Sequence, residues 1–182
     1  MADMREKLIT SSIELIRQQG GASHLNLRAI ARQAGCAHTN AYNYFPDFNT
    51  LLWEVMETVL KQIVARVSPV AADYRKIVEA PLHFALNEPG LARFLFLENC
   101  FKGPMPTTIK KLLAQMQEHT LEVCPPHYLS KDVLNALVQG YVMGELCQYL
   151  QKRNQDEAAS SALQRITQNV TLLLGPSNQT AS

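Results

Sequence analysis

Apolar residues recur at spacings of three and four along most of the chain, which is typical of amphipathic helices. In the first such segment, Leu8, Ile13 and Ile16 share one face, and Gly20 and Gly21 follow it. No segment of useful length alternates apolar and polar residues as a half-buried strand does. The pattern therefore predicts an all-α protein with about nine helices.

Capping residues and helix breakers give the expected helix boundaries. Ser, Thr, Asp and Asn side chains cap helix starts, proline suits a first turn, and glycine often follows a helix end. A bend is expected near Pro81, inside the fifth helix. By these signals, we expect helices at residues 3–19, 27–34, 38–44, 47–67, 68–87, 91–101, 107–123, 130–153 and 154–175.

The segment 26–52 has the pattern of a helix-turn-helix. Asn26 is a good N-cap, and the apolar residues of 27–34 form one inward stripe. Gly35 follows where a chain leaving a helix needs a positive φ. The next helix, 38–44, is rich in short polar side chains and tyrosines, which suit base edges and phosphates. An ordinary helical hairpin would also place a glycine at the turn, so the motif alone leaves that alternative open.

Several positions in this region resemble the tetracycline-repressor (TetR) family of transcriptional regulators. The matching residues are the run LRAIARQAG at 27–35, YNYF at 42–45 and the leucine pair 51–52, and residues 5–20 fit the first helix of that family. The resemblance covers about the first third of the chain. It implies a helix-turn-helix domain at 1–46 and a helical ligand-binding and dimerisation domain at 47–176. The remaining residues, 177–182, are expected to be a disordered tail.

Carried over by position, the resemblance implies a set of DNA contacts around the second and third helices. They are Asn26, Arg28, Ala37, His38, Thr39, Asn40, Tyr42 and Asn43. Tyr44 and Phe45 are expected to pack inside. Two positions depart from the family: Phe48 stands where a phosphate-contacting lysine is usual, and Thr39 replaces a small residue. Losing a lysine contact should weaken salt-dependent affinity.

The composition bears on oligomer formation and on the charge available for binding nucleic acid. Of the 182 residues, 18% are charged, which is low for a globular protein, so part of the surface is expected to be covered in an oligomer. The net charge of +1 gives little global attraction to nucleic acid. Between Gly20 and Pro46, however, Arg28 and Arg32 stand without any carboxylate. The local field is therefore mildly positive where DNA would bind.

The four cysteines are scattered and form no CxxC pair, so neither a disulfide framework nor a zinc module is indicated. Cys124 and His127 have the spacing of half a metal site, but no second pair lies nearby in the sequence. No leader and no membrane-spanning apolar run is found, and we expect a cytoplasmic protein without a cofactor. Catalytic motifs such as a phosphate-binding loop or HExxH are also missing, so an enzyme is the weakest of the candidate classes.

The last two helices are expected to form a homodimer, as the resemblance also implies. Gly140 and Gly144 share one face of the segment 130–153, which lets another helix approach closely. In the segment 155–174, Ala162, Ile166 and Val170 belong to one apolar row. The alternative is that these faces pair within one chain.

In the resembled family, the C-terminal helices enclose a pocket for a small effector, here expected to be apolar or amphipathic. Apolar residues with a few polar groups would suit such a pocket, although each suits a plain core equally well. The candidates in our main set are Trp53, Met56, Phe84, Phe94, Cys100, Met116, Tyr141 and Cys147. Further candidates are Phe96, Met105, Met143 and Tyr149, with His83, His119 and His127 as polar groups.

The sequence thus favours a dimeric, ligand-responsive transcriptional repressor that binds a partly palindromic operator in double-stranded DNA. The competing hypothesis is an all-helical ligand carrier or protein-interaction module that no longer reads DNA. Phe48 and the low positive charge of the helix-turn-helix region motivate that alternative.

Overall fold

The computed structural model describes residues 3–67, 72–151 and 159–175. Within these residues it contains nine α-helices and no strand, which confirms the predicted fold class. No helix in this part of the chain is long and apolar enough to cross a bilayer. The helices are α1 Met4–Gln19, α2 Leu27–Gln33, α3 His38–Ala41, α4 Phe48–Val67, α5 Tyr74–Asn87, α6 Pro89–Phe96, α7 Thr107–Glu122, α8 Lys131–Gln151 and α9 Ala159–Leu174.

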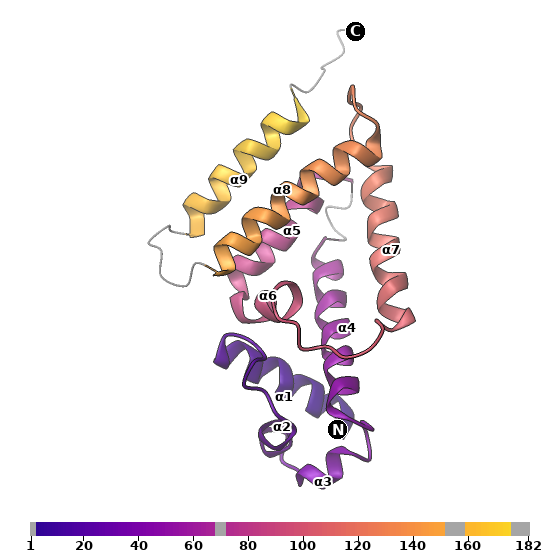
Figure 1. Ribbon diagram of the computed structural model, residues 1–182, viewed down its shortest axis with the longest axis vertical. Coiled ribbons are helices and arrows are strands. Elements are labelled where there is room, and N and C mark those ends of the chain that lie inside the picture. The colour runs from indigo at the N-terminus through magenta and orange to yellow at the C-terminus, as the bar shows by residue number, and fades with distance from the viewer. Residues whose placement is uncertain (1–2, 68–71, 152–158, 176–182) are drawn as a thin grey trace.

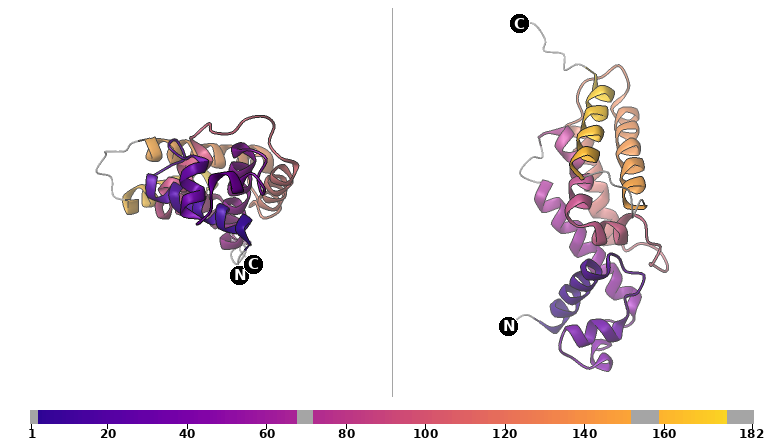
Figure 2. Two further views of the ribbon diagram at one scale, coloured as in Figure 1. Left: turned by 90° about the horizontal axis from the view of Figure 1, so that it is seen from below. Right: turned by 90° about the vertical axis from the view of Figure 1, so that its left-hand side faces the viewer.

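Helices α1, α2 and α3 form a head at one end of the elongated molecule (Figures 1 and 2). The inward stripe of α1 supplies Leu8 and Ile16, both fully buried, and α2 adds Ile30. Ala41 of α3 and Phe45 just after it are also buried against this core. Because the head is small, these few side chains fix the positions of its three helices.

Helix α4 joins the head to the rest of the molecule (Figure 1). The Asp47 carboxylate accepts a hydrogen bond from the Thr50 amide at 2.6 Å, so Asp47 caps the helix as the sequence predicts. Near its start α4 packs against α1, and farther along it packs against α5 and α7. A shift of α4 would therefore displace both the head and the helices α5 and α7.

Helices α5 to α9 form the body, which we define as the helices beyond α4. Helix α5 packs against α6, α8 and α9, while α7 lies beside α4 and α8 (Figures 1 and 2). On α8, Leu134, Val138, Val142 and Leu146 are buried. This apolar stripe gives the body its core.

The head contacts the body most closely where α1 meets α6. The Arg17 guanidinium donates two hydrogen bonds to the Glu88 carboxylate, at 2.8 and 2.9 Å. The Glu98 carboxylate accepts one from the Ala22 amide at 2.6 Å. Gly90 lies so near α1 that an added Cβ would stand 2.6 Å from the Ile16 carbonyl oxygen. A glycine at this position lets the two helices touch through their backbones.

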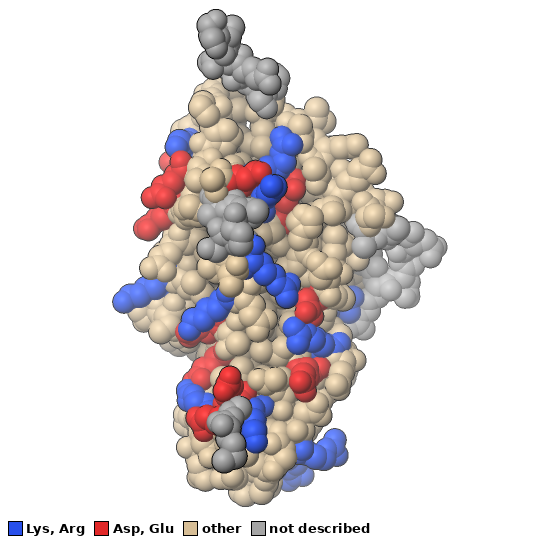
Figure 3. Space-filling model, turned by 180° about the vertical axis from the view of Figure 1, so that it is seen from behind, with Lys and Arg blue, Asp and Glu red and all other residues tan. Residues whose placement is uncertain are grey.

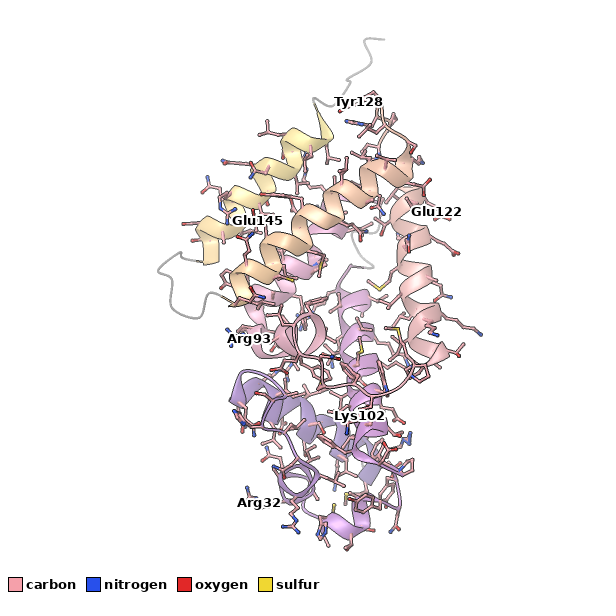
Figure 4. The ribbon with its side chains drawn as sticks, in the orientation of Figure 1. Arg32, Arg93, Lys102, Glu122, Tyr128 and Glu145 are labelled. Atoms are coloured by element: carbon pink, nitrogen blue, oxygen red, sulfur yellow. The ribbon has the colours of Figure 1, made fainter. Side chains whose placement is uncertain are left out.

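A second link connects the loop before α7 to the start of α4. The Asn49 side-chain amide donates to the Lys102 carbonyl at 3.0 Å, and its oxygen accepts from the Lys102 amide at 2.7 Å. Figure 4 shows Lys102 near the lower part of α4, close to the head. The side chain of Asn49 therefore holds the loop to α4 through two hydrogen bonds.

Three helices, α3, α5 and α6, differ from their predicted ranges. Helix α3 ends at Ala41 instead of residue 44, because the following amides of Asn43 and Tyr44 bond three residues back, to Asn40 and Ala41. Helix α5 begins at Tyr74, where the Asp73 carboxylate accepts from the Lys76 amide at 3.3 Å. The expected start at residues 68–69 lies outside the described residues.

The sixth helix differs at both ends from the predicted range 91–101. It starts at Pro89, since proline suits a first helical turn. It ends at Phe96, and the chain beyond it is irregular. Phe101 therefore lies outside the helix, where its ring stacks on Trp53 at 4.3 Å between centroids. Among the remaining expectations, the capping box at residues 154 and 157 and the tail at 177–182 lie outside the described residues.

Candidate functional site

The candidate DNA-contacting residues lie on the outer side of the head. Their positions depend on the Asn26 cap, whose side-chain oxygen accepts from the Ala29 amide at 3.0 Å and starts α2. Arg28 and Arg32 point away from this helix into solvent, whereas Ile30 and Ala31 are fully buried. Figure 4 shows Arg32 at the lower end of the head.

The turn between α2 and α3 has the expected glycine geometry. Gly35 has φ 76°, a left-handed conformation that L side chains rarely adopt. The Cys36 amide donates to the Ala31 carbonyl at 2.9 Å, which closes the end of α2. This turn sets the direction in which α3 leaves.

Helix α3 presents a polar, uncharged surface. Its buried contact is Ala41, which is fully inside the head. His38 and Thr39 are exposed, and so is Tyr42, with 52% of its surface accessible. Asn40 is half-buried, and its side-chain oxygen accepts a hydrogen bond from the side-chain amide of Asn43 at 2.7 Å.

Seven of the eight residues expected to contact DNA are exposed in the described structure, and Asn40 is half-buried. Asn26 differs in one respect, because its side-chain oxygen is already used by the helix cap. Phe45 is buried and Tyr44 half-buried, as expected for residues that pack inside. Phe48 is half-buried against the core, so the start of α4 offers an aromatic ring and no cation.

Positive charge on the head is limited, and part of it is used internally. Arg5 forms an ion pair with Glu54 of α4, and its guanidinium lies 4.8 Å from the centre of the Phe45 ring. Arg5 therefore links α1 to α4 instead of standing free beside DNA. On the face shown in Figure 3, the lower end of the head is mostly uncharged, with Lys or Arg at its edge.

A cavity of about 740 Å³ lies in the body between α4, α5, α7 and α8. Most of its lining is apolar, and α8 contributes several polar side chains. The apolar lining includes Ile63, Val78, Leu112, Met116 and Val142. The volume falls within the usual range for small-molecule sites.

Of the eight main pocket candidates, Met116 lines this cavity and the others do not. Met56, Phe84 and Phe94 are buried in the core, and Trp53 stacks on Phe101. Cys100 packs against the same core, where burial raises the pKa of its thiol to about 11. Cys147 is half-buried on α8. Tyr141, also on α8, accepts a hydrogen bond from the Asn169 amide of α9 at 2.7 Å.

Two further candidates also line the cavity, Met143 and His119. Sequence reasoning missed the polar pair Asn135 and Gln139 on α8. A signal for them was present, because Asp132, Asn135 and Gln139 recur at helical spacing in an otherwise apolar segment.

Cys124 and His127, which have the spacing of half a metal site, make local contacts within the protein. The Cys124 thiol is buried, and burial raises its pKa. His127 accepts a hydrogen bond at Nδ1 from the Leu129 amide at 3.1 Å. Within the described residues, no group of three or more His, Cys, Asp or Glu side chains is arranged to hold a metal ion.

Comparison with known proteins identifies the fold. Neither a scan against family models nor a search of curated proteins found a match. Several solved structures share the fold, among them the transcriptional regulator FadR from Bacillus subtilis in complex with stearoyl-CoA. It has a TM-score of 0.68 and 14% identity over 93% of this chain and 97% of that one.

RolR in complex with its ligand resorcinol is similar with a TM-score of 0.58 and 17% identity, over 95% of this chain and 93% of that one. NalD from Pseudomonas aeruginosa, the secondary repressor of the MexAB-OprM multidrug efflux pump, has a TM-score of 0.54 and 18% identity, over 91% and 94%. The chain therefore has the all-helical fold found in solved transcriptional regulators over nearly its full length.

Proposed function

We propose that this protein is a dimeric, ligand-responsive transcriptional repressor of the TetR type, which binds a partly palindromic DNA operator. The observation that carries the proposal is the exposed polar surface of α3, held on the head by buried Ala41. Exposed Thr39 and Asn43 offer side chains that hydrogen-bond base edges, and Arg28 offers a cation for phosphate.

The cavity supports the ligand-responsive part of the proposal. It is lined by α4, which begins beside the head, and by α5, which packs against α6. Helix α6 in turn contacts α1. A ligand that prefers one arrangement of these helices would change the orientation of the head and release DNA. The complexes of FadR with stearoyl-CoA and of RolR with resorcinol support a ligand site in this fold.

The dimer is supported by apolar residues that α8 leaves exposed. Val133 and Leu137 have 47% and 51% of their surface accessible. Gly140 and Gly144 continue the same stripe, and an added Cβ at either glycine meets no atom of its own chain within 4 Å. A second copy of α8 could pack closely along this stripe.

One of the rows expected at the interface lies elsewhere. Ala162, Ile166 and Val170 of α9 are fully buried within their own chain, where α9 packs against α5 and α8. These three residues are unavailable to the proposed interface. The proposed interface therefore consists of the outer side of α8 with exposed Leu172 of α9.

The test is binding to DNA upstream of the protein's own gene, measured at low salt by fluorescence anisotropy. Replacing Arg28 and Tyr42 together by alanine should raise the Kd at least about tenfold, because two exposed contacts are lost. Circular dichroism and sedimentation should be unchanged, since neither side chain is buried.

Arg66→Ala is the matched control, because Arg66 is exposed in the last turn of α4, at the end of that helix away from the head. It should leave DNA binding unchanged. Wild-type protein that shows no preference for any sequence over bulk DNA would refute the proposal and favour a ligand carrier or protein-interaction module.

A further inference from the structure

The cavity has a polar side that comes from one face of α8. Asp132, Asn135, Gln139 and Met143 all line it, at helical spacings of three and four residues. Helices α4 and α5 line the cavity with apolar side chains such as Ile63 and Val78. Helix α7 contributes both apolar and polar side chains, the polar ones being Gln115, Gln117, His119 and Thr120. A bound molecule would therefore place its polar group toward α8 and its apolar part against α4 and α5.

Hydrogen bonds within the protein fix the Asn135 amide. Its oxygen accepts from the Tyr74 hydroxyl at 3.1 Å and from the Gln139 amide at 3.2 Å. Among the described residues, the Asn135 side chain makes no hydrogen bond besides these two at the oxygen. Asn135 is 5% exposed as a whole residue and lines the cavity, while its Nδ2 atom is not among the fully buried atoms that lack a partner. A ligand in the cavity can therefore reach this donor, and a ligand that supplies an acceptor is stabilised by it.

The charges of the lining disfavour an anion. Its one carboxylate is Asp132, and the described residues that line the cavity include no lysine and no arginine. His119 also lines the cavity, and its ring lies 3.5 Å from the Glu122 carboxylate. A carboxylate or phosphate in the cavity would lose water without gaining a lysine or arginine partner, which is costly.

We propose that the cavity takes a neutral amphiphile whose carbonyl or hydroxyl oxygen accepts a hydrogen bond from Asn135 Nδ2, and that it rejects carboxylates and phosphates. This inference rests on the proposed function of the cavity as the effector site. Gln139 contributes by positioning the Asn135 amide and by offering its own oxygen to a ligand hydroxyl.

Isothermal titration calorimetry of the full-length protein with 2-decanone, decanoate and stearoyl-CoA tests the proposal. The ketone should bind with a Kd at least about tenfold below that of either anion, the difference expected for one hydrogen bond and an uncompensated charge. Asn135→Leu should remove most of this preference by weakening ketone binding. Since Asn135 is buried, a second variant is needed in case this one fails to fold.

Gln139→Arg supplies that second variant, because it adds a cation to the lining. It should lower the Kd for decanoate by about tenfold or more. Gln148→Arg is the matched control: Gln148 is exposed farther along α8 and does not line the cavity. It should leave both ligands unaffected.

The outcomes separate this inference from the proposed function. If decanoate or stearoyl-CoA binds wild-type protein as tightly as the ketone and releases it from DNA, the ligand class is wrong and the regulator remains. If the ketone does not bind, the inference fails. If, in addition, no amphiphile of either charge binds or alters DNA affinity, ligand responsiveness itself fails.

Discussion

Single residues on the head show how little charge is available for the proposed DNA contact. Arg28 and Arg32 are exposed, while Arg5 is paired with Glu54 and Phe48 contributes no charge. Each phosphate contact adds about one unit to the slope of log affinity against log salt. Affinity should therefore depend more on polar contacts from α3 than it does in strongly basic DNA-binding proteins.

Glu79 is a buried carboxyl group on α5 that the proposed function does not use. It is 6% exposed, and its Oε1 atom has no hydrogen-bond partner among the described residues. Burial raises the pKa of Glu79 above its ordinary value of 4.5, although Thr167, His83 and Arg75 act in the opposite direction. The folded state consequently binds the Glu79 proton more tightly than the unfolded state does.

This shift gives a pH-dependent prediction for Glu79→Gln. Because the pKa is raised in the folded state, protonated Glu79 contributes its full stabilisation of the fold below pH 4.5. This stabilisation is lost as pH rises through the folded-state pKa. The glutamine variant should therefore be more stable than wild type at pH 7.5, by about 1 kcal/mol, because it removes a buried charge. The difference should shrink as pH falls toward 4.5.

Urea unfolding of both proteins across this pH range measures the effect. Glu118→Gln, an exposed position on α7, is the control and should show no such dependence. A Glu79→Gln variant that is less stable than wild type at pH 7.5 would contradict the prediction.

At the scale of elements, the contact between α1 and α6 connects the head to the body. The Arg17 and Glu88 pair holds it at the surface, and Gly90 permits the close approach beneath. Helix α6 also packs against α5 and α8, both of which line the cavity. Movement of the cavity helices would thus reach α1 as well as α4.

Gly90→Ala should weaken the contact between α1 and α6. The added methyl group would lie 2.6 Å from the Ile16 oxygen and 3.2 Å from Gly20 Cα, so α6 has to move away from α1. We expect a loss of about 2 kcal/mol in the free energy of unfolding, as for an overpacked core position. Chemical denaturation at one fixed protein concentration measures it.

Lys110→Ala is the control, because Lys110 is exposed on α7 and outside both the proposed interface and the cavity lining. Alanine is a good helix former, so this variant should be as stable as wild type. If the two substitutions have the same effect, close packing at Gly90 does not determine the contact.

The head lies at one end of the molecule (Figure 2). The exposed stripe of α8, formed by Val133, Leu137, Gly140 and Gly144, lies on the body. Twofold pairing along this stripe would give two heads on one assembly, as successive major grooves require. Exposed apolar side chains in one line are otherwise unfavourable in water. The assembly, and not the single chain, would thus be the DNA-binding unit.

Leu137→Arg should separate the proposed dimer. Leu137 is 51% exposed in the single chain, so arginine fits there without disturbing the fold, but it would place a charge in the interface. Sedimentation velocity should show a monomer, and DNA affinity should fall by about tenfold or more because one head binds alone.

Tyr128→Arg is the matched control, since Tyr128 is 90% exposed in the loop before α8 (Figure 4). This variant should remain a dimer and keep its DNA affinity. A Leu137→Arg protein that sediments as wild type does would show that the interface lies elsewhere.

The sequence by itself determined the fold class and most helices, because these follow from local patterns. Asn26, Asp47 and Ser130 cap helices where their side chains predict, and the φ of Gly35 is positive as expected. Prediction failed where boundaries depend on distant partners. The end of α6 is such a case, because the helix stops at Phe96 and Phe101 packs on Trp53 instead of continuing it.

Only the tertiary structure decided which apolar and polar side chains share a space. Met56, Phe84 and Phe94 have the composition of a pocket lining but lie in the core, while Met116 reaches the cavity. Asn135 and Gln139 face that cavity because Tyr74 of α5 anchors the Asn135 amide from a distant part of the chain. Periodicity shows which side of a helix is turned inward, but the space left between helices depends on how all of them pack together.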